Sequence, residues 1–258
     1  MHIQLFPTEL GEIIQSIFCT IPAPPVLLKL LHPVDANEAR AKTKQPYTLL
    51  CRTERDQLQN YTLAKRRSEY LTSRICAKIS TMDYLRSHGN PTVTMEQIEI
   101  KNSESGRPYV KVFPTPMCPV PEISLSHSKE YGLAVAAQNY CGVDIQRHEQ
   151  TLKRVKEKYC TNKEYLLLPK TLRTQGELEK LALLWSAKET IQKSLSAGTM
   201  PYFTEIQLRE CKTMSGDNVV FTFSFTSERE KKWPEQLKVV AGTFKNYAIA
   251  ITAVEGIH

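Results

Sequence analysis

Long apolar segments, paired cysteines and extended basic tracts are all missing from this 258-residue chain. No stretch of about 18 uninterrupted apolar residues occurs, which argues against a transmembrane helix. The apolar residues between Ile13 and Leu31 are broken by polar residues and three prolines and follow no basic region, unlike a signal peptide. The seven cysteines are scattered without a Cys-x-x-Cys pair, as is typical of free thiols in a reducing compartment. The sequence therefore predicts a cytoplasmic protein with no membrane segment, and gives little support to a zinc site.

The chain is basic, with a net charge of +7, but its lysines and arginines form no long run. The densest cluster is Lys65-Arg66-Arg67, with Arg74 and Lys78 behind it. Nucleic-acid binding requires phosphate contacts spread along a surface, and no basic tract interleaved with aromatic residues provides them. The charge pattern therefore favours a small anionic ligand or an acidic protein partner.

Apolar spacing predicts two long helices, each followed by short strands. The first helix spans about residues 62–88 and ends at Gly89-Asn90-Pro91, and the second spans about 177–196 and ends near Gly198. The predicted strands are 123–128, 133–138, 143–146, 219–225, 237–244 and 248–254. This order predicts an α+β fold with two similar halves, residues 1–136 and 137–258. Residues 1–60 match no pattern that we can name.

Two short motifs each provide one carboxylate. In residues 142–146 (Gly-Val-Asp-Ile-Gln), apolar and polar residues alternate, so Asp144 and Gln146 share one face of a predicted strand. In residues 185–189 (Trp-Ser-Ala-Lys-Glu), Glu189 lies on a predicted helix, with Lys188 beside it and Lys193 one turn later. Together these groups suit a hard divalent cation that holds a phosphate. Alone, the first motif is more typical of a solvated or capping strand carboxylate and the second of an exposed ion pair, and only their combination at this spacing favours a cation site.

Two further motifs carry groups that suit phosphate. Residues 124–128 (Ser-Leu-Ser-His-Ser) place His127 among hydroxyls at a strand end, where it can donate to phosphate oxygens or be an ordinary hydrogen-bonded histidine. In Gly106-Arg107-Pro108, glycine permits a tight turn and arginine offers a forked donor. Alone, this second motif is merely a turn.

The order and spacing of these motifs resemble those of the 4′-phosphopantetheinyl transferases. The similarity covers about residues 60–200 and is closest to the long, pseudodimeric type, the surfactin-synthetase-activating and enterobactin-synthetase-component enzymes. The resemblance also includes an early helix with Arg66 and Arg67, and Glu164 within residues 159–165. It implies that the two halves form a pseudodimer, each half a small antiparallel sheet packed with a long helix. The active site would lie in the cleft between them, and the chain would be a monomer.

The resemblance further implies transfer of the 4′-phosphopantetheine arm of coenzyme A to a serine of an apo acyl or peptidyl carrier protein. Carrier proteins are typically acidic, which suits the basic balance of this chain. The reaction would use Mg²⁺, or Mn²⁺ in its place, and release 3′,5′-ADP. The implied metal ligands are Asp144, Glu189 and Gln146. The implied catalytic residues are Glu189, Lys193, Glu164 and Lys188. The implied coenzyme A contacts, from the N-terminal half, are Arg67, Arg66, Gly106, Arg107, Pro108, Ser126 and His127.

One position departs from the family pattern. The family usually has an acidic residue two positions after the strand aspartate, and here the residue is Gln146. Because Mg²⁺ retains several waters and takes only one or two carboxylates, the change weakens the expected site without removing it. A coenzyme A and carrier-protein binding module that has lost transfer, or a phosphohydrolase acting on coenzyme A, are the alternatives. The sequence specifies neither the carrier nor its fatty-acid, polyketide or peptide pathway.

Overall fold

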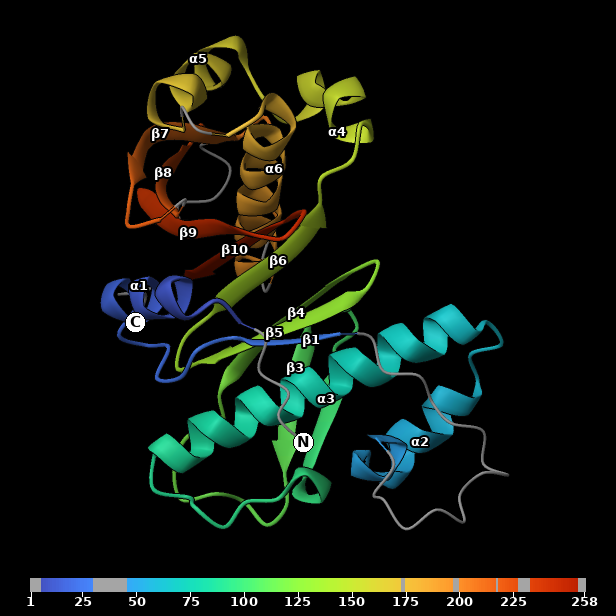
Figure 1. The fold of residues 1–258 in the computed structure, drawn as a ribbon. Helices are drawn as coiled ribbons and strands as arrows, with labels where there is room; N and C mark the ends of the chain where they lie inside the picture. The colour runs from blue at the N-terminus through green and yellow to red at the C-terminus, as the bar shows by residue number, and fades with distance from the viewer. Residues whose placement is uncertain are drawn as a thin grey trace.

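The computed structural model describes residues 6–29, 46–172, 175–196, 200–216, 218–226 and 233–254. Within these residues, each half of the molecule has one long helix lying against an antiparallel sheet (Figure 1). The predicted α+β class is therefore confirmed. None of the helices in this part of the chain is long and apolar enough to cross a bilayer.

The N-terminal half is organised around helix α3 (Ala64–Ser87). This helix packs against a three-stranded sheet whose order is β1 (Val26–Lys29), β5 (Tyr131–Ala137) and β4 (Glu122–Ser128). A separate hairpin of β2 (Ile98–Asn102) and β3 (Pro108–Val112) extends beside β4. The remaining elements are η2 (Pro46–Leu49), α2 (Arg52–Gln59) and η3 (Met95–Gln97).

The C-terminal half is a five-stranded sheet with a helix on each face. Its strand order is β6 (Cys141–Arg147), β10 (Tyr247–Ala253), β9 (Gln236–Phe244), β8 (Val219–Phe225) and β7 (Ile206–Thr213). Helix α6 (Glu177–Ser194) covers one face, and α4 (Thr151–Arg154), η4 (Lys156–Lys158) and α5 (Asn162–Thr171) lie near it. Helix α1 (Thr8–Ile17) packs through Leu10 and Ile14 on the other face. The first helix therefore lies with the second half of the chain.

Most elements downstream of residue 62 agree with the sequence prediction. The long helices predicted at 62–88 and 177–196 are α3 and α6, and the six predicted strands correspond to β4, β5, β6, β8, β9 and β10. The sequence pattern missed α1, β1, α2, α5 and β7. Gly198, expected to cap the second helix, lies outside the described residues.

Serine side chains join the two halves where β4 runs beside β6. Alternate residues of β4 are serines, and each hydroxyl oxygen accepts a hydrogen bond from a backbone N–H of β6. The pairs are Ser124 with Val143 at 3.1 Å, Ser126 with Ile145 at 3.2 Å, and Ser128 with Arg147 at 3.3 Å. Because side chains alternate between the faces of a strand, the three serines point the same way. This serine ladder fixes the register of β6 against β4.

A buried ion pair ties α3 to the surrounding loops. Nζ of Lys78 lies 2.7 Å from the carboxylate of Glu54, and both side chains are almost inaccessible to solvent. The same carboxylate accepts hydrogen bonds from the backbone N–H groups of Cys51 and Ile100, both at 2.9 Å. Glu54 therefore caps α2 and links it to β2 through one side chain.

Helix α6 has a pair of the same kind. Nζ of Lys188 lies 2.8 Å from the carboxylate of Glu164, and both side chains are again buried. Glu164 caps α5 by accepting from the backbone N–H of Thr161 at 2.8 Å, and it links α5 to β7 by accepting from that of Leu208 at 2.8 Å. In both pairs, a lysine of the long helix meets the glutamate that caps a shorter helix.

We predict that both pairs are needed for stability. Lys78→Met and Lys188→Met each leave a buried carboxylate without its cation, so each should lower the free energy of unfolding by about 3 kcal/mol or more. Lys153→Met is a matched control, because Lys153 pairs with Glu177 at the surface and such pairs contribute about 1 kcal/mol or less. Urea denaturation followed by circular dichroism measures all three. A loss at Lys78 or Lys188 no larger than at Lys153 would contradict the structural role.

Candidate active site

Helix α6 approaches β6 closely because β6 contains a glycine at the contact. A Cβ atom at Gly142 would collide with the backbone carbonyl of Thr190, one residue after Glu189. The missing side chain therefore lets the helix lie directly on the strand. As a result, the polar face of α6 lies beside Asp144, two residues along β6.

The carboxylate of Asp144 is the centre of this contact. Its Oδ1 accepts hydrogen bonds from Ser126 and Lys193, both at 2.8 Å, and its Oδ2 accepts one from Ser186 at 2.8 Å. Asp144 is only 6% exposed, so the three donors replace the water that a carboxylate requires. The side chains come from β4 and α6, which means that one aspartate links elements of both halves. From the sequence, Ser126 was expected to contact coenzyme A, and Ser186 was not among the predicted site residues. Both serines lie in the motifs given above.

Glu189 and Lys193 lie beside Asp144 on the same face of α6. Burial, followed by the negative charge of Asp144, raises the pKa of Glu189 above its ordinary value, and the ammonium of Lys193 opposes the rise. Lys193 donates to Asp144 and to the carbonyl of Val143 at 3.1 Å. Its ion pair in this structure is therefore with the strand carboxylate, which differs from the surface pair with Glu189 considered from the sequence.

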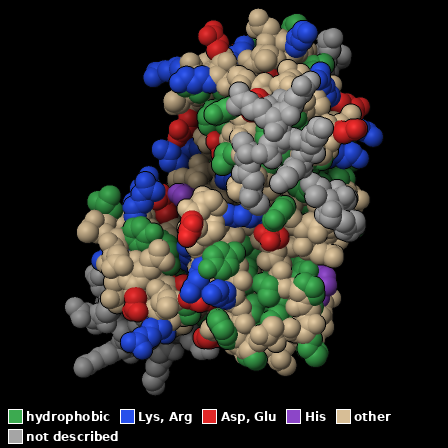
Figure 2. Space-filling view, turned by 180° about the vertical axis from the view of Figure 1, so that it is seen from behind, with side chains coloured by type: hydrophobic (Ala, Val, Ile, Leu, Met, Phe, Trp, Pro, Cys, Tyr) green, Lys and Arg blue, Asp and Glu red, His purple; other side chains and the backbone are tan. Residues whose placement is uncertain are grey.

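A pocket of about 290 Å³ opens beside Glu189 and Lys193. The turn at Gly106-Arg107-Pro108 lines its other side, so the pocket lies between the two halves. In the space-filling view the surface is hollowed between the halves, and basic side chains and a histidine gather around the hollow (Figure 2). This arrangement suits an anionic ligand.

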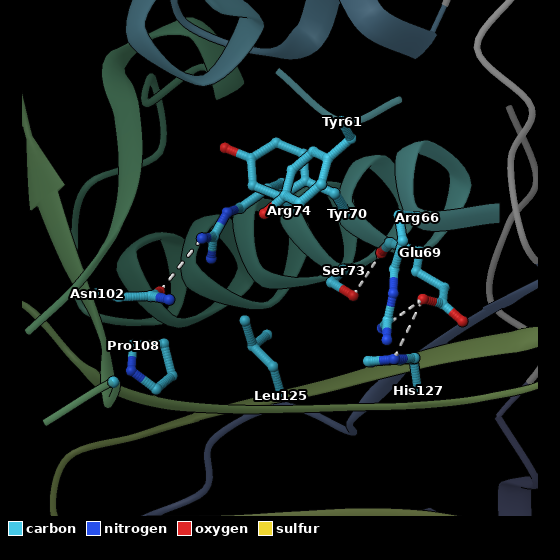
Figure 3. Close-up of a pocket in the computed structure, with 11 residues that line it drawn as sticks. Tyr61, Arg66, Glu69, Tyr70, Ser73, Arg74, Asn102, Pro108, Leu125 and His127 are labelled. Carbon is cyan, nitrogen blue, oxygen red and sulfur yellow. Dashed lines mark hydrogen bonds and ion pairs between the residues drawn. The ribbon is translucent and has the colours of Figure 1, made fainter. Parts of the chain in front are cut away.

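A second pocket, of about 440 Å³, lies between α3 and the β2–β3 turn (Figure 3). Tyr61, Tyr70 and Arg74 line its inner wall, and the guanidinium of Arg74 lies 4.8 Å from the ring centre of Tyr70. Arg74 also donates to the side chain of Asn102 at 3.2 Å. Aromatic rings beside an arginine offer a stacking surface for a flat ring. The sequence analysis noted Arg74 only as part of a basic cluster and missed both tyrosines.

His127 and Arg66 lie at the end of this pocket that faces the hollow. Both approach the carboxylate of Glu69, His127 at 3.6 Å and Arg66 at 3.1 Å (Figure 3). Partial burial lowers the pKa of His127 below its ordinary value, an effect that Glu69 opposes and that Lys193 and Arg66 reinforce. Gly106 and Pro108 line both pockets, so the predicted turn and histidine motifs do meet in space.

Two of the predicted coenzyme A contacts are engaged elsewhere. The Nε of Arg67 donates to the backbone carbonyl of Tyr61 at 2.7 Å, and Arg67 does not line either pocket. Arg107 lines the smaller pocket, but its guanidinium is bonded to α6 and to Glu122. Of the two arginines expected to contact coenzyme A from the early helix, Arg66 lines the larger pocket and Arg67 lines neither.

Glu164 and Lys188 also lie away from the two pockets described here. Lys188 donates to the carbonyl of Phe203 at 3.2 Å as well as to Glu164, and burial lowers its pKa while Glu164 opposes the change. Gln146 follows Asp144 on the same face of β6 and donates through its Nε2 to the carbonyl of Arg147 at 2.9 Å. The structure thus separates Glu164 and Lys188 from the remaining predicted catalytic residues.

The oxygen donors of Asp144 and Glu189 fit a small, hard cation. Mg²⁺ needs only one or two carboxylates, because waters and substrate phosphates complete its coordination. In the part of the chain that the structure describes, no group of three or more His, Cys, Asp or Glu side chains is arranged to hold a metal ion. Burial raises the pKa of Glu189, and repulsion from Asp144 adds to the rise. A cation between the two carboxylates would relieve that repulsion.

Comparison with known proteins gives a family match over the segment that carries Asp144, Glu189 and Lys193. The sequence model of the 4′-phosphopantetheinyl transferase superfamily matches residues 140–252. A solved structure with some similarity is a holo-(acyl-carrier-protein) synthase from Bacillus anthracis str. Ames in complex with CoA (3′,5′-ADP). It is 26% identical over 33% of this chain and 71% of that chain, with a TM-score of 0.28. No curated protein matches the sequence.

An α+β chain with two carboxylates and a lysine beside a basic hollow has the features of a group-transferring enzyme. Its C-terminal half, residues 140–252, matches the sequence model of the 4′-phosphopantetheinyl transferase superfamily. The expected enzyme class is therefore confirmed at the level of the superfamily. The resemblance to the surfactin and enterobactin branch stays a prediction.

We predict that His127 titrates below pH 6.5, because partial burial and nearby cations disfavour its charged form. Glu69→Gln should lower its pKa further, since Glu69 supports the imidazolium. Lys193→Met should raise it. NMR titration of the imidazole protons measures these shifts, with His127→Gln identifying the resonance. A value at or above 6.5 in the unmodified chain, or an upward shift in Glu69→Gln, would contradict this electrostatic account.

Proposed function

We propose that this chain transfers the 4′-phosphopantetheine arm of coenzyme A to a serine of an apo acyl or peptidyl carrier protein and releases 3′,5′-ADP. The observation that carries the proposal is the meeting of Asp144, Glu189 and Lys193 beside a pocket between the two halves. All three residues lie in the segment that matches the superfamily. Coenzyme A is the co-substrate, and the synthase named above was solved with it.

In this proposal Mg²⁺, or Mn²⁺, is held by Asp144 and Glu189, with Gln146 near enough in sequence to add an amide oxygen. When bound, the cation neutralises pyrophosphate charge as the phosphoryl bond breaks. Lys193 neutralises Asp144 in the free chain at 2.8 Å. A cation at Asp144 would take over that role and free the ammonium for the leaving group, 3′,5′-ADP.

Glu189 is the proposed general base for the carrier serine. A general base works best when its pKa is near the operating pH, and burial, the largest cause, raises the pKa of Glu189 in that direction. Glu164 and Lys188 were expected to assist, but their mutual ion pair is buried away from the pockets. We therefore assign them a structural role.

The larger pocket is proposed to hold the nucleotide of coenzyme A. Tyr61, Tyr70 and Arg74 form the stacking wall, while Arg66 and His127 lie toward the hollow with charges that suit phosphate. The positive balance of the chain, +7, suits electrostatic steering of an acidic carrier protein. The nucleotide contacts then come from the N-terminal half and the catalytic residues from the C-terminal half, with a boundary near residue 136.

We also propose that the two halves are structural copies. The order β1-β5-β4 corresponds to β6-β10-β9, and the hairpin β2–β3 corresponds to β7–β8. Tyr131–Ala137 pairs in the first half as Tyr247–Ala253 pairs in the second. The two buried glutamate–lysine pairs sit at the same points of this arrangement. Val26 pairs with Ala134 in the first half as Asp144 pairs with Ala250 in the second. Val26 therefore occupies the position of Asp144, and only the second half has the proposed metal-binding carboxylate there.

We predict that transfer requires Mg²⁺ and both carboxylates. Asp144→Asn and Glu189→Gln should each lower the rate of carrier modification about a hundredfold or more, with the fold retained. Glu149→Gln is the matched control, because Glu149 pairs with Lys129 at the surface and should leave the rate unchanged. The assay is the intact mass of an apo carrier protein incubated with coenzyme A and Mg²⁺.

Two other outcomes separate the competing functions. Coenzyme A binding without any added mass on a panel of apo carriers would indicate a binding module. Release of 3′,5′-ADP without a modified carrier would indicate a phosphohydrolase. Full transfer in excess chelator, or in either carboxylate variant, would contradict the assignment of the metal site.

A further inference from the structure

Arg107 is a predicted phosphate ligand whose surroundings point to a different role. Its side chain is only 10% exposed although it lies in a turn whose neighbouring residues, Ser103 to Gly106, are exposed. One face of the guanidinium stacks on the ring of Tyr140, 4.4 Å from the ring centre, and Nη2 pairs with Glu122 at 3.0 Å. Tyr140 and Glu122 therefore fix the position of the Arg107 guanidinium from two sides.

The remaining donor of Arg107 is directed at the end of α6. Its Nη1 lies 3.4 Å from the carbonyl oxygen of Lys193, 3.5 Å from that of Ser194 and 3.1 Å from Oγ of Ser196. The last carbonyls of a helix have no partner within the helix, and they carry partial negative charge. The carbonyl oxygen of Lys193 also accepts from Oγ of Ser196 at 2.8 Å. Arg107 therefore adds a charged donor, supplied by the other half of the chain, to the C-terminal cap that Ser196 begins.

This cap acts on the turn of α6 that carries Lys193. Terminal turns fray unless their carbonyl groups are satisfied, and Lys193 is the penultimate residue of α6. Its ammonium must reach Asp144 across the gap between helix and strand. Glu189 lies one turn earlier, where Gly142 packs against the backbone of Thr190. Loss of the cap should therefore disturb Lys193 more than Glu189.

We infer that Arg107 is a positioning residue, which acts on the transfer reaction by fixing Lys193 and makes no bond to coenzyme A. The inference rests on the proposed function, because it assigns Arg107 a role in that reaction. It replaces the sequence expectation that Arg107 binds a phosphate. It also explains why the glycine turn approaches the catalytic helix: Ser105, Gly106 and Arg107 line the smaller pocket together with Lys193.

The test is a double-mutant cycle in the carrier-modification assay. Arg107→Ala should lower kcat roughly tenfold or more, since a small misplacement of a catalytic group has effects of that size. The dissociation constant for 3′,5′-ADP, measured by calorimetry, should change less than about twofold, because the inferred contacts do not involve the ligand. In a Lys193→Met background, Arg107→Ala should have little further effect on kcat, because residues that act through one another are not additive.

Arg55→Ala is the matched control, because Arg55 is an exposed arginine of α2 and its loss removes one positive charge. Arg107→Lys keeps a positive charge near the carbonyls, so it should retain more activity than Arg107→Ala. If Arg107→Ala does not fold, Arg107→Lys carries the test: any fall in its kcat should come without weaker binding of 3′,5′-ADP. A rise in the dissociation constant with kcat retained, or full additivity with Lys193→Met, would overturn the inference. A lower melting temperature with unchanged kcat would also overturn it. Failure of the unmodified chain to modify any carrier contradicts the proposed function instead, before the variants are compared.

Discussion

The carboxylate of Asp144 is the point on which the arrangement of the site depends. A buried carboxylate requires donors, and those donors come from β4 through Ser126 and from α6 through Ser186 and Lys193. The two elements belong to opposite halves of the molecule, so one charge determines how the halves meet. Gly142 permits the approach of α6, and the serine ladder sets the register of β6. The catalytic geometry and the joint between the halves are therefore the same set of contacts.

The polar character of this joint has a functional consequence. Two side chains that the sequence assigned to coenzyme A instead align the halves: Ser126 holds Asp144, and Arg107 holds the end of α6. The buried pairs Glu54–Lys78 and Glu164–Lys188 make each half rigid from within. Since breaking a buried pair is costly, these lysines are needed for the fold whether or not they touch a ligand. Rigid halves joined by oriented donors keep Glu189 and Lys193 in place before substrate binds.

The sequence was sufficient for the long, strongly periodic elements and for the motif residues that face each other. Helices α3 and α6 and the strands from β4 to β6 follow from apolar spacing, and the order of motifs predicted that Asp144, Glu189 and Lys193 meet. The sequence was insufficient where the same residue type can either bind a ligand or stabilise the fold. Arg107 and Lys188 carry the charges that a phosphate site requires, and only the fold shows that carbonyls and Glu164 occupy them. The sequence did not indicate Tyr61 and Tyr70 as pocket residues, because the pocket that they line forms only where α3 meets the β2–β3 turn.

The central claim is that Asp144 and Glu189 together hold a cation that contacts the pyrophosphate of coenzyme A. Isothermal titration of coenzyme A with and without Mg²⁺, in the unmodified chain and in Glu189→Gln, tests it most directly. We expect Mg²⁺ to tighten coenzyme A binding about tenfold or more in the unmodified chain, a gain of about 1.4 kcal/mol, and to have little effect in Glu189→Gln. Binding of 3′,5′-ADP, which lacks the pyrophosphate, should be insensitive to Mg²⁺ in both. An equal gain in Glu189→Gln, or none in the unmodified chain, would contradict the account.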